Sequence, residues 1–204
     1  MTAKRTAITI ASAAAITTAV AYVKPWEGLW LTAKVDTIGT GRPVTACYGE
    51  TENVKLGQRF TKQECDDLLE FKLKRYDAEI GRCIQVDLPD YTRAALISFA
   101  YNVGSAGACR STVVKKMNAG DIRGGCEALM QWTRAQGRVV KGLVNRRSKE
   151  RKLCLAGLDQ IKAIEPKPLT SSEFKIDPYS CFGAGRYEAM SEGRQCPTKK
   201  WWQK

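Results

Sequence analysis

Eight cysteines constrain the fold of this 204-residue chain more than any other feature. They are well separated and form no C-x-x-C pair: Cys47, Cys65, Cys83, Cys109, Cys126, Cys154, Cys181 and Cys196. All-cysteine zinc ribbons and thioredoxin-type redox sites need closely spaced pairs, so the spacing favours disulfide bonds over metal binding. The alternative is that several are buried free thiols in a reduced protein. Disulfides persist outside the cytosol, so the first reading requires an export signal.

An uncharged N-terminal run supplies a candidate export signal. It covers residues 6–23, with Lys4 and Arg5 before it and Lys24 after it. As a helix it spans about 27 Å, which barely crosses a hydrocarbon core. The run holds many Ala and Thr residues and only five Ile or Val residues. Insertion into a bilayer is therefore expected to be marginal, with the N-terminus in the cytoplasm and the remaining chain outside.

Four interpretations of residues 6–23 compete. The pattern Ala19-Val20-Ala21 fits cleavage of a signal peptide. The run could also be a stable anchor, a weak tether that later leaves the bilayer, or a plain buried helix. Its Ala and Thr content favours the weak tether. The expected location is then the inner membrane, as a single span, followed by release to the periplasm.

Composition also limits the chemistry. The chain has no histidine, which excludes Ser-His-Asp and Cys-His nucleophilic sites and imidazole-based zinc sites. No cofactor and no metal are expected. The net charge of +12 suits an anionic cell wall, a nucleic acid or a membrane surface equally well. Charge alone therefore does not identify the partner.

Periodicity predicts an α+β fold in which a small hairpin sheet lies beside a larger helical lobe, with a cleft between them. Pro25 is expected to open a short helix or turn, and residues 35–49 carry the β-branched and turn-forming residues of a hairpin. Helices are expected over 61–82, where Thr61 and Glu64 form a capping box, and over 91–103, 111–118, 121–132 and 143–155. The predicted parts are an N-terminal membrane segment (1–23), a catalytic domain (24–157) and a cysteine-containing C-terminal extension (158–204).

Two carboxyl groups are candidates for catalysis. Glu27 stands beside an aromatic residue, and Asp36 follows nine residues later at the entry to the hairpin. Two acids on opposite sides of a cleft are what glycoside hydrolysis requires, one to protonate the leaving oxygen and one to position water. From spacing alone, a salt bridge for Glu27 and a turn for Asp36 explain the pattern better.

Further motifs give the two acids a context. Glu27-Gly28 and Asp36 are followed by Thr45-Ala46-Cys47-Tyr48-Gly49-Glu50-Thr51, and the order continues with Phe99 to Gly104, Ser111-Thr112, Leu129-x-x-Trp132, and Gly142-Leu143-x-x-Arg146-Arg147-x-x-Glu150. This series resembles the phage lysozymes of glycoside hydrolase family 24 over about residues 25–156. The weak N-terminal tether is similar to the signal-arrest-release segment of one endolysin branch of that family.

The resemblance implies a role for three residues. Glu27 would be the general acid, Asp36 would hold or activate the attacking water, and Thr45 would orient that water. Eight residues separate Asp36 from Thr45 here, more than in the usual signature, so Thr40 is a competing candidate. Gly39-Thr40-Gly41 lacks a following helix and is interpreted as a hairpin turn rather than a phosphate loop.

The resemblance also implies the substrate and partners. The substrate would be peptidoglycan, cut by a lysozyme (muramidase) at the β-1,4 bond between N-acetylmuramic acid and N-acetylglucosamine during host lysis. The other expected partners are the bacterial inner membrane, through residues 6–23, and the host secretion machinery. A monomer that binds no nucleic acid is expected. A lytic transglycosylase with Glu27 as its single acid and a non-enzymatic basic membrane-disrupting or nucleic-acid-binding protein remain as alternatives.

Three cysteine pairs are expected, although eight cysteines allow 105 pairings. Cys181–Cys196 would close the C-terminal extension. Cys47–Cys65 would tie the hairpin to the first long helix. Cys109–Cys126 would leave Cys83 and Cys154.

Overall fold

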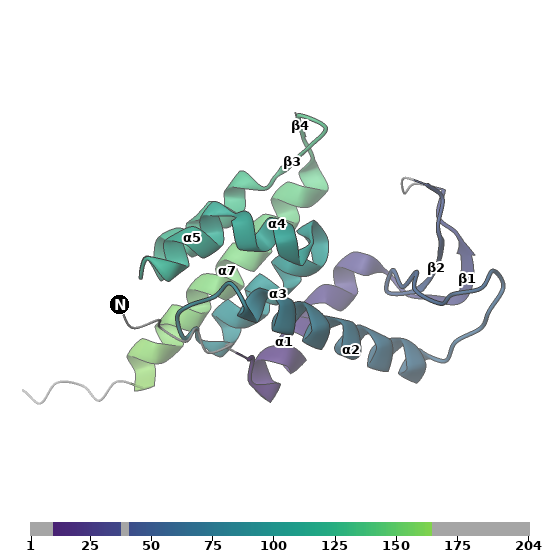
Figure 1. Ribbon diagram of the computed structural model, residues 1–204, viewed down its shortest axis with the longest axis horizontal. Coiled ribbons are helices and arrows are strands. Elements are labelled where there is room, and N and C mark those ends of the chain that lie inside the picture. The colour runs from purple at the N-terminus through teal and green to yellow at the C-terminus, as the bar shows by residue number, and fades with distance from the viewer. Residues whose placement is uncertain (1–9, 38–40, 165–204) are drawn as a thin grey trace, which may run out of the picture. The chain divides into compact units, whose positions relative to one another are not determined.

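The computed structural model describes residues 10–37 and 41–164, with side chains described as far as residue 159. Seven α-helices and two two-stranded sheets make up this part of the chain. The β1–β2 hairpin lies at one end, just beyond the end of α1, and the helices gather around α3 and α7 (Figure 1). The predicted α+β architecture, a small sheet beside a larger helical region, is confirmed.

Helix α1 (Ala13–Glu27) runs from within the uncharged N-terminal run to Glu27, so the separate short helix or turn predicted to open at Pro25 is wrong. Pro25 lies inside this helix near its end rather than opening a new one. The side chain of Ser12 caps α1 by accepting a hydrogen bond from the Ala15 backbone N–H. Four apolar residues share its buried face at three- and four-residue steps, namely Ala15, Ile16, Ala19 and Val23. The N-terminal run is helical here because this face packs into the core.

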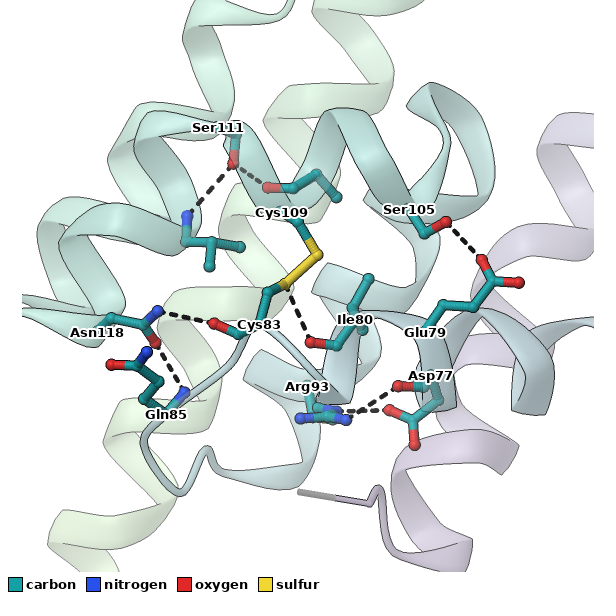
Figure 2. Close-up of a disulfide and its surroundings, with 12 residues drawn as sticks. Asp77, Glu79, Ile80, Cys83, Gln85, Arg93, Ser105, Cys109, Ser111 and Asn118 are labelled. Carbon is teal, nitrogen blue, oxygen red and sulfur yellow. Dashed lines mark hydrogen bonds and ion pairs between the residues drawn. A yellow bond between two sulfur atoms is a disulfide. The ribbon is translucent and has the colours of Figure 1, made fainter. Parts of the chain in front are cut away.

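Two carboxylates of the helical region hold the start of α1. The Ala11 N–H donates to Asp77 Oδ2 at 2.8 Å, and the Ser12 hydroxyl donates to Asp90 Oδ1 at 2.6 Å. Asp77 is itself buried and paired with Arg93, as Figure 2 shows. The chain just before α1 is therefore bonded to α2 (Lys62–Gly81) and α3 (Asp90–Val103).

The described part of the chain holds no helix with both the length and the hydropathy needed to cross a membrane. The expected Cys181–Cys196 pair and Thr40 lie outside the described residues.

The first sheet is a hairpin of β1 (Trp30–Val35) and β2 (Val44–Cys47). The strands are antiparallel, with an irregularity between Trp30 and Lys34. Strand β1 thus begins earlier than the hairpin predicted over residues 35–49. A second, very short hairpin joins β3 (Arg134–Ala135) to β4 (Arg138–Val139), where the sequence predicted a loop.

The predicted helices are present, with one addition. The capping box of Thr61 and Glu64 at the start of α2 is confirmed. Helix α3 is almost entirely buried from Thr92 to Ala100, as its apolar sequence predicted. An unforeseen short helix, α4 (Ser105–Arg110), follows it. The remaining short elements are α5 (Thr112–Asn118), α6 (Ile122–Ala128) and the 3₁₀ turn η1 (Leu129–Gln131).

Helix α7 (Lys141–Ile164) continues through the point where the sequence predicted its end. The sequence predicted a helix that ends near residue 155, but Gly157 lies within α7, where this helix approaches α3. A Cβ at Gly157 would lie 2.5 Å from Thr92 Oγ1 and 2.8 Å from the Thr92 backbone N. The glycine is thus needed for close packing, and the domain boundary predicted after residue 157 falls inside a helix.

Three disulfides link the described elements. Cys47–Cys65 is confirmed and ties β2 to α2, with its Cα atoms 4.9 Å apart. The predicted Cys109–Cys126 pair is wrong: the bonds are Cys83–Cys109 and Cys126–Cys154. Helix α4, which the sequence analysis missed, brings Cys109 to the chain leaving α2, where Cys83 lies (Figure 2). Cys126 is then left to pair with α7.

Candidate active site

Glu27 lies at the C-terminal end of α1, immediately before the hairpin. The following Gly28 has φ of +69°, a backbone conformation that favours glycine, and it turns the chain from the helix into β1. The Glu27 side chain is 21% exposed. Arg146 Nη1 donates to Glu27 Oε1 at 2.7 Å, across 119 residues of sequence. The position of Glu27 at the end of α1 and its hydrogen bond from Arg146 of α7 therefore fix the place of the carboxylate.

Arg146 belongs to a buried polar network. Its Nε donates to Glu150 Oε1 at 3.2 Å, and its Nη2 donates to the Ser98 carbonyl oxygen at 3.4 Å. Glu150 also accepts hydrogen bonds from the Ser98 hydroxyl, at 2.7 Å, and from Arg147. Arg147 in turn donates to Asn102 Oδ1. The network joins Glu27 to the core of the helical region.

Sequence reasoning noted Arg146, Arg147 and Glu150 as part of a motif but assigned them no role. Their spacing carries a signal, because residues three and four apart in a helix are neighbours on its surface. The pairing of Arg146 with Glu27 had no local signal, since the two residues meet only through the packing of α7 against the helical core.

Asp36 and Thr45 lie on the β1–β2 hairpin. Val35 pairs with Val44, and Lys34 pairs with Thr45. The Asp36 N–H donates to the Pro43 carbonyl at 2.8 Å and extends this ladder by one step. Because side chains alternate along a strand, Asp36 and Thr45 share one face of the hairpin as diagonal neighbours. The register thus brings these two together, whereas the contacts described for Glu27 run to α7.

Contacts on α2 and α3 fix the end of the hairpin where Trp30 pairs with Cys47. The Tyr48 hydroxyl donates to Asp66 Oδ1 at 2.8 Å, and the Tyr101 hydroxyl donates to the Tyr48 carbonyl at 2.6 Å. Burial, with a smaller contribution from Asp66, raises the pKa of Tyr48 to about 12. Burial and the negative charges of Glu27 and Glu50 also raise the pKa of Tyr101. Both phenols therefore stay protonated at neutral pH and can donate these bonds.

The geometry offers acid–base chemistry. A partly exposed carboxyl group at a helix end is followed by a second carboxyl and a hydroxyl on one hairpin face. Among residues 10–37 and 41–164, no group of three or more His, Cys, Asp or Glu side chains is placed to hold a metal ion. The pocket found near the hairpin is lined by β2, α2 and α3 residues, including Cys47, Cys65 and Lys72, rather than by the candidate acids.

Comparison with known proteins places this α+β fold in the class of lysozymes. The family model described as phage lysozyme matches residues 24–150. The chain belongs to the phage lysozyme family.

Similar sequences and structures agree with this assignment. The chain is 45% identical over 114 residues to the SAR-endolysin of Enterobacteria phage PA-2, covering 55% of this chain and 69% of that protein. It is 35% identical over 155 residues to the SAR-endolysin of Pseudomonas phage phiKMV, covering 74% and 94%. Among solved structures, the muramidase domain of SpmX from Asticaccaulis excentricus matches with a TM-score of 0.62 and 27% identity, covering 74% of this chain and 99% of that one. The active form of the P1 phage endolysin Lyz gives 0.60 and 25%, covering 72% and 86%.

Proposed function

We propose that this protein is a phage endolysin that hydrolyses peptidoglycan for host lysis, at the β-1,4 bond between N-acetylmuramic acid and N-acetylglucosamine. The observation that carries the proposal is the placement of Glu27. It ends a helix that buries one face in the core, is partly exposed and paired with Arg146, and directly precedes a hairpin that presents Asp36 and Thr45 on one face. Membership of the phage lysozyme family supports the same reaction.

The proposed reaction uses these three residues in sequence. Protonated Glu27 gives its proton to the glycosidic oxygen as the bond from that oxygen to the anomeric carbon breaks. A water molecule, positioned by Asp36 and Thr45, attacks the anomeric carbon. The Asp36 carboxylate accepts the proton that this water loses. The products are two saccharide chains, and one water molecule has been consumed.

Glu27→Gln tests the assignment of the acid. The variant should lose at least about a hundredfold in the rate at which it clears permeabilised cells, which is the usual contribution of a general acid. Glu127→Gln is a matched control, because Glu127 is an exposed carboxylate paired with Arg151 on the surface. Activity of Glu27→Gln within about tenfold of the unmodified protein would place the acid elsewhere.

Product mass separates hydrolysis from the transglycosylase alternative. A hydrolase yields a free reducing end, whereas a transglycosylase yields a 1,6-anhydro end that is lighter by one water. Mass spectrometry of digested peptidoglycan should show the hydrolysed product. A dominant anhydro product would leave Glu27 as the acid and remove the water-positioning role of Asp36 and Thr45.

Membrane control is the second part of the proposal. Similar phage proteins are named SAR-endolysins, and we infer that residues 6–23 tether the exported chain to the inner membrane until release to the periplasm. The burial of Ala15, Ala19 and Val23 in the folded core supports this. Those residues cannot occupy a bilayer and the core at once, and Glu27 belongs to the same helix. The tethered chain is therefore expected to be inactive.

A further inference from the structure

Glu150 is a buried carboxylate that the proposed reaction does not use. Its side chain is 0% exposed. It accepts hydrogen bonds from Arg146, Arg147 and Ser98, so three donors compensate for its removal from water. Burial raises its pKa, while the two arginines and Ser98 act in the opposite direction. These donors favour the ionised form.

Arg146 lies between Glu150 and the candidate acid. One guanidinium bonds Glu27 Oε1 through Nη1, at 2.7 Å, and Glu150 Oε1 through Nε, at 3.2 Å. Its side chain is 7% exposed, so water screens its charge weakly. Arg147, which is fully buried, places a second positive charge beside the Glu150 carboxylate.

Other described side chains face this network from α1 and α3, and the Glu50 carboxylate acts on one of them, Tyr101. Tyr22 faces Glu150 and Arg146 from α1, and its pKa is raised to about 12 by burial first and then by Glu150. Tyr101 faces Glu27 from α3, and burial and the Glu27 charge raise its pKa. Both are neutral at pH 7. Ser98 and Asn102, also from α3, are uncharged donors and acceptors. The ion pairs described for this network join two arginines to Glu27 and Glu150.

We propose that Glu150 is a positioning residue for proton donation. It orients Arg146 against Glu27 and offsets the positive charge of the arginine pair, so that Glu27 can carry a proton before the reaction. The inference rests on the proposed function, in which Glu27 is the general acid.

The consequence follows from charge. Without Glu150, Arg146 would keep Glu27 as its described carboxylate partner, Arg147 would add its uncompensated charge next to Arg146, and Glu27 would be held ionised. An ionised Glu27 has no proton to give. The fraction of active enzyme would then fall on the alkaline side of the pH profile, while substrate binding would remain close to normal.

Glu150→Gln in the full-length chain tests this, with kcat/KM measured on purified peptidoglycan at constant ionic strength. The alkaline limb of the profile should move to lower pH by about one unit, the size expected from removing one charge at an effective dielectric constant near 20. Activity at pH 7 should fall about tenfold, through kcat rather than KM. An unchanged limb, or an equal loss at every pH, would overturn the proposal and leave Glu150 a structural role.

Arg147→Gln should shift the alkaline limb of the pH profile in the opposite direction. This variant removes one positive charge and leaves Glu150 to Arg146, so the alkaline limb should move to higher pH. A merely structural network would give the same kind of loss in both variants. Glu127→Gln removes a carboxylate paired with Arg151 and should leave the limb in place.

A measurement on the unmodified protein covers the case in which these variants fail to fold. Carbon-13 NMR of the glutamate carboxyl groups should show Glu150 ionised throughout the pH range in which the enzyme is active. A Glu150 that is protonated in that range would overturn the proposal. The two proposals fail separately: an active Glu27→Gln refutes the assignment of the acid, whereas an inactive Glu27→Gln with an unshifted Glu150→Gln profile refutes only this inference.

Discussion

Helices α1 and α7 both supply side chains to the candidate active site, but different forces hold them in the fold. Helix α1 is buried through small apolar groups, chiefly Ala15, Ala19 and Val23. Helix α7 is held by a disulfide at Cys154, by close packing at Gly157, and by buried charged residues. The apolar groups on the buried face of α1 need no polar partner, whereas the buried charges of α7 find their partners in the folded protein.

The difference matters because small groups contribute little to folding. Burial stabilises by about 0.8 kcal/mol for each CH₂ group, so an alanine face adds only a few kcal/mol. Transfer of the same face to a bilayer is of similar size. The tether proposed above thus requires α1 to exchange between two environments, whereas α7 stays in one, and Glu27 belongs to α1.

The largest effect should come from removing the covalent hold on α7. Replacing Cys126 and Cys154 with alanine should lower the free energy of unfolding by about 2–4 kcal/mol, because the unfolded chain regains the freedom of a closed loop. Chemical denaturation of protein exported to the periplasm measures this. The same replacement of Cys83 and Cys109 is the control that leaves α7 untouched. A change below about 1 kcal/mol would show that packing alone holds α7.

A second pair of variants separates the two environments of α1. Ala19→Leu and Ala14→Leu should add the same insertion preference, about −0.5 kcal/mol. Ala19 is 0% exposed, so leucine there should also overpack the core and cost about 1–3 kcal/mol, whereas Ala14 is exposed. Ala19→Leu should therefore remain in the membrane fraction longer and delay lysis more. Equal delays would mean that docking of α1 into the core does not drive release.

A pH-dependent contact links α1 to α2. Asp66 accepts a hydrogen bond from Lys62 and pairs with Lys24 of α1 at 2.9 Å, and these contacts hold the pKa of Asp66 well below its usual range. Because the folded pKa is depressed, the stabilisation is present above the unfolded value of about 3.9 and is lost as the pH falls through the folded value.

Asp66→Asn should therefore cost about 1–2 kcal/mol at pH 7 and progressively less below about pH 4. Thermal unfolding across this pH range measures the difference. Asp67→Asn is the control, since the described bond of this exposed neighbour is to Gln63. A cost for Asp66→Asn that does not change with pH would rule out the charge as its cause.

The smallest effect concerns the start of α1. Ser12→Ala removes the cap on Ala15 and the hydrogen bond to Asp90, and should cost about 0.5–1 kcal/mol. Ser12→Thr keeps the hydroxyl and should cost less. If both variants unfold like the unmodified protein, the α1 terminus adds nothing to its docking.

Local patterns predicted much of this fold. The capping box at Thr61, the apolar sequence of α3 and the spacing of Cys47 and Cys65 all concern neighbouring elements, and each prediction is confirmed. Pro25 misled because proline usually marks the start of a helix, whereas here it lies within α1, and the helix predicted to end near residue 155 continues through Gly157. The close packing of Gly157 against α3 is a tertiary contact, which the local sequence of α7 does not reveal.

The candidate site divides in the same way. The assignment of Glu27, Asp36 and Thr45 stays a prediction, made from the order of a motif. The bond from Arg146 to Glu27 depends on how α7 packs, so no local pattern could supply it. The predicted pairing of Cys109 with Cys126 was wrong for a related reason. Helix α4, which brings Cys109 to Cys83, has too few residues to show a helical period in the sequence.

The alanines of α1 have a consequence for mutational tolerance. Ala19-Val20-Ala21 fits a peptidase cleavage pattern, yet Ala19 lies in the core, and a chain beginning at Tyr22 would lack most of this packed face. Selection for close packing and selection for signal-peptide cleavage both keep residues small, but they restrict different positions. Packing restricts size at every fourth position, 15, 19 and 23, and leaves intervening positions such as Thr17 permissive. A substitution library over this segment would therefore show tolerance that varies with the helical period of a core element, although the composition of the segment resembles that of a cleaved signal peptide.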